Sequence, residues 1–233
     1  MKELNNWKSP NVLNVYRFGS MVYGTNRIGS DEDFYVVQEV YTASNCTDNH
    51  HISSLEFQQL LDNQDIQAIE CFFLDPVNVF KETVQFTYKL DKVKLRTSIS
   101  AVCDNSWVKG KKKLIVSADY NKKLALKSIF HSLRIRDLGI QIALYGKIIS
   151  YMRMNYIFDD LLKLGEQYER IELWDAIDTK YRKEYNSLRS QFVELCPKGN
   201  NRQIKIDKVR KMLKDNNQEL SLDLIKNIVD EIG

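Results

Sequence analysis

A glycine-serine pair and two aspartates give the sequence its clearest chemical pattern. Gly19 and Ser20 follow an apolar run, and ten residues later come Asp31 and Asp33. Residues i and i+2 of a strand point to the same side, so this spacing aims both carboxylates at one place. Carboxylates that close repel each other, and a bound divalent cation removes that cost. Their hard oxygen atoms suit Mg²⁺ or Mn²⁺.

The bend at Gly19-Ser20 is suited to phosphate. Glycine has no Cβ, so its backbone can approach a ligand closely. Free backbone N–H groups where a helix begins bind phosphate readily, and the hydroxyl of Ser20 adds a hydrogen bond. A phosphate-binding bend beside metal-binding carboxylates describes a site for a nucleoside triphosphate with its metal. Nucleotidyl transfer, in which an acceptor hydroxyl attacks the α-phosphorus, needs that combination.

A third carboxylate is then expected near the attacking group. Glu70 is the candidate, because it lies in an apolar segment predicted to be a strand, at residues 66–74. An acid in such a segment is costly unless it is paired or bound to a metal. The alternatives for Glu70 are an acid at a strand edge or a core salt bridge, and Asp65 and Asp48 are alternative third acids.

The spacing resembles that of the DNA polymerase β-like nucleotidyltransferase superfamily. The resemblance is carried by Phe18-Gly19-Ser20, then Asp31-x-Asp33-Phe34, then Ile69-Glu70-Cys71. Within it, the Gly-Ser-x-x-Tyr-Gly segment at 19–24 and Ser-Asp-x-Asp at 30–33 look like a bacterial and phage subgroup that includes proteins associated with RNA repair. One departure is Glu32, which stands where the superfamily usually has an apolar residue. Strand alternation predicts that Glu32 points away from the metal side, exposed or paired.

The resemblance implies roles for these residues. Asp31 and Asp33 would bind the metal ions, Glu70 would complete the catalytic triad, and Gly19-Ser20 would hold the triphosphate of an NTP, with ATP favoured. We include Tyr23 and Ser30 among the nucleotide-binding candidates.

A helix after the catalytic part supplies further candidates. The segment 129–134 resembles the His-x-x-Arg helix of the same subgroup. Lys127, His131 and Arg134 share one face of that expected helix. They are predicted to contact the triphosphate or the acceptor, and the alternative is a solvated face with His131 partly buried.

Apolar patterning predicts an α/β (α+β) fold. Strands are expected at 12–18 and 34–37, with 40–41 as a candidate continuation of the second. A short helix is expected at 54–61, capped by Ser54. Helical spacing covers 121–149, 158–195 and 205–231, with a loop at 197–200. We therefore expect a small mixed-sheet nucleotidyltransferase domain at 1–105, followed by a helical domain at 106–233.

Charge and composition bear on partners and location. The 233 residues carry a net charge of only +3, but lysines crowd one stretch. RNA, tRNA-like in kind, is the preferred acceptor, bound through Lys109, Lys111, Lys112 and Lys113. Without an apolar run of bilayer length or a signal core, we expect no membrane partner and a cytoplasmic location in a bacterium or a phage-infected host.

Other functions are compatible with the same residues. Adenylylation of a protein, as in toxin–antitoxin systems, would use the same metal site. A non-catalytic nucleotide or nucleic-acid binder would keep the fold without turnover, and a purely structural protein would bind no NTP. Oligomeric state is not readable from the sequence.

Overall fold

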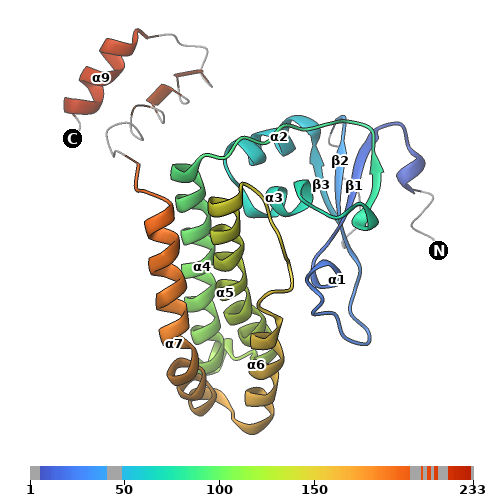
Figure 1. Cartoon of the computed structure of the whole chain (residues 1–233), viewed down its shortest axis with the longest axis vertical. Coiled ribbons are helices and arrows are strands. Elements are labelled where there is room, and N and C mark those ends of the chain that lie inside the picture. The colour runs from blue at the N-terminus through green and yellow to red at the C-terminus, as the bar shows by residue number, and fades with distance from the viewer. Residues whose placement is uncertain are drawn as a thin grey trace. The chain divides into compact units, whose positions relative to one another are not determined.

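The computed structural model describes residues 6–40, 49–199, 206, 209–210, 213–214 and 220–231, with the side chains at 6, 49 and 228–231 excepted. The chain forms two compact units, Met1–Cys196 and Pro197–Gly233. The first unit holds both a sheet and a helical bundle, as predicted for an α+β chain (Figure 1).

A small mixed sheet forms the N-terminal part. Its strands are β1 (Val12–Phe18), β2 (Asp33–Gln38), β3 (Asn49–Ser53) and β4 (Val79–Glu82), in the order β3-β2-β1-β4. Strand β1 is antiparallel to β2 and β4, whereas β2 and β3 are parallel. The two strands predicted at 12–18 and 34–37 are confirmed, and the second ends at Gln38.

The two faces of the sheet are covered differently. Tyr16 and Tyr35 belong to the large core, where they meet Phe57 of α2 (Ser54–Asp62) and the apolar side of α3 (Ile66–Phe72). On the opposite face Phe34 packs against Trp7 in a smaller cluster. Alternation along β2 therefore places Asp33 on the side of Tyr35 and the helices.

Helix α2 confirms the predicted helix, with its cap one residue earlier. The side chain of Ser53 accepts a hydrogen bond from Glu56 N, and the Glu56 carboxylate accepts one from Ser53 N. This reciprocal arrangement satisfies two backbone donors that the first turn would leave free. Ser54 is the first helical residue rather than the cap.

The strand predicted at 66–74 is wrong, because this segment forms α3. The Asp65 carboxylate accepts hydrogen bonds from Gln67 N and Ala68 N, and so caps a helix at this point. A short apolar run has no clear period, so a buried helix and a buried strand look alike in the sequence. After α3, the segment Pro76–Asn78 forms a 3₁₀ turn that leads into β4.

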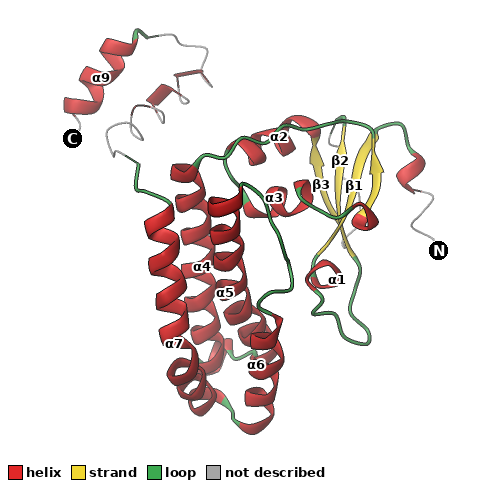
Figure 2. Cartoon of the chain, in the orientation of Figure 1, coloured by secondary structure: helices red, strands yellow, loops and turns green. Residues whose placement is uncertain are grey.

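Long helices form the rest of the first unit (Figure 2). They are α4 (Lys92–Ile115), α5 (Lys122–Tyr145), α6 (Asn155–Gln167) and α7 (Arg170–Leu195). The predicted helical segments at 121–149 and 158–195 are confirmed, with α5 ending where Gly146 takes φ 71°. The expected boundary at 105/106 falls inside α4, which packs along α5, so the bundle and the sheet share one unit.

The second unit contains α9 (Leu222–Glu231). Ile206 and Ile225 are buried against each other there, with Val209 and Leu213 beside them. In the part of the chain that the structure describes, no helix combines the length and apolar character needed to cross a membrane.

Candidate functional site

Gly19 and Asp33 lie in direct contact at the end of β1. A Cβ built on Gly19 would lie 2.5 Å from Asp33 Oδ2, which is closer than real Cβ contacts allow. Gly19 also has φ 77° and ψ −151°, a conformation that essentially only glycine adopts. The bend after β1 therefore requires glycine for two reasons. Its backbone conformation strains any other residue, and a side chain would collide with the Asp33 carboxylate.

The bend continues into a one-turn helix. Helix α1 spans Ser20–Tyr23 and ends at Gly24, which takes φ 67°. The N–H groups of Val22 and Tyr23 bond to Gly19 O. The first N–H groups of a helix have no partner within it, so those of Ser20 and Met21 are available to an oxygen ligand.

The two aspartates straddle the start of β2. Asp33 is its first residue and half-buried, whereas Asp31 precedes the strand and is exposed. Glu32 points to the other face, where its carboxylate lies 3.2 Å from Arg17 Nη2, as strand alternation predicts. Unlike Glu32, neither aspartate forms an ion pair with another residue in the described part of the chain.

Ser30 shapes the loop before the aspartates. Its hydroxyl accepts a hydrogen bond from Arg27 N at 2.8 Å, and its own N–H donates to Arg27 O at 2.9 Å. The guanidinium of Arg27 pairs with Asp159 of α6 at 2.6 Å. Ser30 thus closes a turn that is tied to the helical bundle, and its hydroxyl is already engaged there.

Glu70 lies in a buried ion pair, which is one of the alternatives that the sequence left open. Its Oε1 is 2.5 Å from Nη1 of Arg134, and the two side chains are only 3% and 2% exposed. Its Oε2 accepts a hydrogen bond from the hydroxyl of Tyr23 at 3.0 Å. Both carboxylate oxygens are therefore used inside the protein.

Tyr23 and Arg134 also contact each other. The guanidinium carbon of Arg134 lies 3.5 Å from the centroid of the Tyr23 ring, a cation–π contact in a desolvated setting. Burial raises the pKa of Tyr23 well above its usual range, and the charge of Glu70 adds to that rise. Burial would lower the pKa of Arg134, but Glu70 and Tyr23 keep it raised. Arg134 is thus charged and occupied rather than directed at a triphosphate.

Two residues that the sequence reasoning missed complete this Tyr23–Glu70–Arg134 cluster. The hydroxyl of Tyr151 donates to Glu70 O at 2.7 Å, and Asn155 Nδ2 donates to Tyr23 O at 2.8 Å. The cluster therefore joins α1, α3, α5 and the start of α6. No spacing rule links residues so distant in sequence, so only the fold reveals them.

His131 borders the same cluster. Its ring centroid lies 6.0 Å from that of Tyr23 in an edge-on arrangement, and its Nδ1 is buried without a hydrogen-bond partner among the described residues. Burial lowers the pKa of His131 well below its usual range, and Arg134 and Lys127 lower it further. These shifts favour the neutral imidazole, and Lys127, one turn away, is exposed.

Of the alternative third acids, Asp65 has a structural role and Asp48 lies outside the described residues. The carboxylate of Asp65 is used to cap α3. Within the described ranges, no three His, Cys, Asp or Glu side chains gather as a metal site would require. The structure thus brings Asp33 to the Gly19 bend but does not gather Asp31, Asp33 and Glu70 into one group.

Two carboxylates can suffice to hold a divalent ion. Mg²⁺ is commonly held by one or two carboxylates together with water and substrate phosphates, without a full protein cage. Asp33 lies against a backbone that only glycine permits, and Asp31 stands two residues before it. These carboxylates have the donor chemistry for such an ion.

The lysine-rich stretch is partly neutralised within the protein. Lys112 and Lys113 both pair with Asp119, at 3.1 and 2.8 Å, and the Lys111 ammonium lies 5.3 Å from the Trp174 ring centroid. Lys109 is exposed. The stretch is less available to phosphates than its composition implies.

Comparison of the sequence with protein-family models and with curated proteins gave no match. The resemblance described above therefore rests on the motif residues themselves.

Proposed function

We propose that this protein is a metal-dependent nucleotidyltransferase that moves a nucleoside monophosphate from an NTP to an acceptor hydroxyl. The carrying observation is the contact between Gly19 and Asp33, where a Cβ would meet the carboxylate at 2.5 Å. Such contact explains why the glycine and the second aspartate occur together at this spacing. It supports membership of the DNA polymerase β-like superfamily that the motifs resemble.

The residues around the Gly19 bend would bind the metal ion and the triphosphate. Asp31 and Asp33 would hold Mg²⁺ or Mn²⁺, which when bound screens the triphosphate charge and lowers the pKa of the attacking hydroxyl. The Ser20 and Met21 N–H groups and the Ser20 hydroxyl would bind phosphate oxygens at the bend. Lys127, exposed on α5, would add a positive charge toward the triphosphate, with ATP as the favoured substrate.

Glu70, Tyr23 and Arg134 would act through position rather than by contact with the nucleotide. Their buried network fixes α1 against α3 and α5. Because α1 directly follows Gly19, this network holds the bend in place. Charged partners with so little exposure form a rigid support only while all of them are present.

The acceptor that we favour is RNA, with a protein side chain as the alternative. Lys109 and Lys111 supply exposed positive charge, whereas the pairing of Lys112 and Lys113 with Asp119 reduces the contribution of the stretch. Incubation with each labelled NTP, Mg²⁺, pooled RNA and pooled cell protein tests this. Label in RNA supports the favoured acceptor, and label only in protein would replace it with adenylylation.

A second candidate, nucleotide binding without transfer, is favoured by one observation. Glu70 is occupied by Arg134 and Tyr23, so among the described residues no third acid joins the two aspartates. Both candidates predict that ATP with Mg²⁺ raises the melting temperature, because a ligand of the folded state stabilises it. Only the transferase predicts release of pyrophosphate. No thermal shift with any NTP would contradict both.

A further inference from the structure

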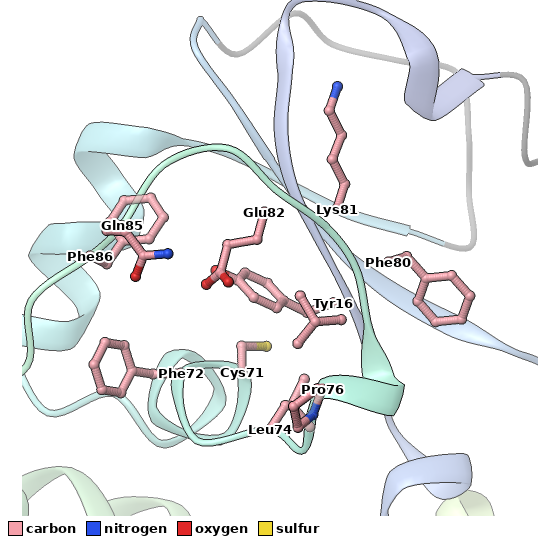
Figure 3. Close-up of a pocket in the computed structure, with 11 residues that line it drawn as sticks. Tyr16, Cys71, Phe72, Leu74, Pro76, Phe80, Lys81, Glu82, Gln85 and Phe86 are labelled. Atoms are coloured by element: carbon pink, nitrogen blue, oxygen red, sulfur yellow. The ribbon is translucent and has the colours of Figure 1, made fainter.

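A cavity lies on the helix-covered side of the sheet at its β4 edge. It has a volume of about 460 Å³ and opens between α3 and the segment around β4. In Figure 3, the side chains of Cys71, Glu82 and Gln85 are directed into this space. The volume is within the range of small-molecule sites.

Apolar and aromatic side chains form part of the cavity wall. Phe72, Leu74, Val79 and Phe86 line it and also pack on the main core. Aromatic rings in such walls favour a flat heteroaromatic ligand, since stacking of a base on an aromatic ring contributes about 1–3 kcal/mol.

The polar side chains of the cavity offer both acceptors and donors, and two of them, Glu82 and Gln85, are exposed. Glu82 brings a carboxylate, which forms no ion pair with another described residue. The Tyr16 hydroxyl accepts from Asn14 Nδ2 at 2.7 Å, which leaves its own proton free to donate. Gln85 can both donate and accept.

An anionic ligand does not suit this cavity. Lys81 is the single basic side chain in the lining, and its ammonium turns away to Trp7 O at 3.0 Å and Ser9 O at 3.1 Å. Figure 3 shows Lys81 extending away from the other lining residues. Glu82 would repel a phosphate, so the cavity is chemically distinct from the proposed triphosphate site.

We propose that this cavity binds the base of a guanine nucleoside, with Glu82 as the specificity-determining residue. The guanine edge carries two adjacent N–H donors beside a carbonyl oxygen. A carboxylate accepts both donors, and the Tyr16 hydroxyl or the Gln85 amide donates to the carbonyl. Adenine presents a ring nitrogen lone pair beside its amino group, which Glu82 repels. The proposal does not depend on transferase activity.

The test is calorimetric titration of the full chain with guanosine and with adenosine, neither of which carries phosphate. Guanosine binds and adenosine binds at least about tenfold more weakly, because unpaired polar groups in a site are costly. Glu82→Gln weakens guanosine binding about 10- to 100-fold, whereas Glu194→Gln, an exposed glutamate on α7, does not.

Two further variants keep the test decisive. Gln85→Trp places a large ring in the cavity from an exposed position and abolishes binding, with thermal melting confirming the fold. Asp33→Asn leaves guanosine affinity unchanged, which separates this site from the proposed metal site. Equal binding of the two nucleosides, absence of guanosine binding at millimolar concentration, or an unaffected Glu82→Gln variant would each overturn the proposal.

Discussion

Nη1 of Arg134 lies 2.5 Å from Oε1 of Glu70, with both side chains almost wholly buried. Removing one member of such a pair leaves an uncompensated charge inside the protein. We expect Glu70→Gln to lower the free energy of unfolding by about 3–5 kcal/mol, measured by urea denaturation. The double variant Glu70→Leu/Arg134→Met should recover much of that loss. A cost below about 1 kcal/mol for Glu70→Gln would show that the pair is not closed in solution.

The contact at Gly19 predicts a difference between two glycine variants. Gly19 and Gly29 both have positive φ, 77° and 82°, but only Gly19 has a neighbour where a Cβ would be. Backbone strain alone costs about 1–3 kcal/mol at either position. Gly19→Ala should therefore lose more stability than Gly29→Ala, and should also lose the thermal shift with ATP and Mg²⁺. Equal losses in the two variants would contradict the close approach of Asp33.

His131 predicts a dependence of stability on pH. Its folded-state pKa is lowered, first by burial and then by Arg134 and Lys127, so the unfolded chain binds the proton more tightly. The folded state therefore keeps its full stability above the unfolded-state pKa of about 6.5. It loses stability as the pH falls below that value, because the unfolded chain then takes up a proton on His131. Unfolding free energies at pH 7.5 and 5.5 should differ less in His131→Gln than in the wild type. If the unfolding free energy changed equally between the two pH values in both proteins, His131 would be solvated.

Much of the fold follows from local patterns in the sequence. Apolar spacing and capping residues predict β1, β2, α2 and α5. The sequence does not predict β3, β4 or α4, and it predicts a strand where α3 forms, because that run has no clear period and only the cap from Asp65 favours a helix. The spacing of apolar residues identifies a helix or strand that buries one face. It cannot tell the two apart in a short segment that is buried on all sides.

The candidate site was predictable only in part. Short spacing brings Gly19 and Asp33 together, because Gly19 directly follows β1, Asp33 begins β2, and these two strands are antiparallel neighbours. Nothing in the sequence pairs Glu70 with Arg134, which are 64 residues apart. An acid in an apolar segment indicates a partner but does not say whether the partner is a metal or an arginine.

Substitutions can test whether Asp65 or Asp48 is the third catalytic acid. Because Asp65 caps α3, Asp65→Ala should cost about 1 kcal/mol of stability and leave nucleotide transfer unchanged. Asp48, the other alternative from the sequence, is tested in parallel as Asp48→Asn in the same transfer assay. Loss of transfer in Asp65→Ala at full folding would contradict the capping role, whereas loss in Asp48→Asn alone would identify the third acid.

We propose above that Asp33 at the Gly19 bend holds the metal for nucleotidyl transfer. Glu32 is the matched control, since it is adjacent in sequence but pairs with Arg17 on the other face of the sheet. The decisive measurement is label transfer from an α-labelled NTP in the wild type, Asp33→Asn and Glu32→Gln, each with Mg²⁺. The account predicts at least about a hundredfold loss in Asp33→Asn, equivalent to roughly 2.7 kcal/mol, with Glu32→Gln near wild type. Transfer that survives in Asp33→Asn, or that falls equally in both variants, would contradict it.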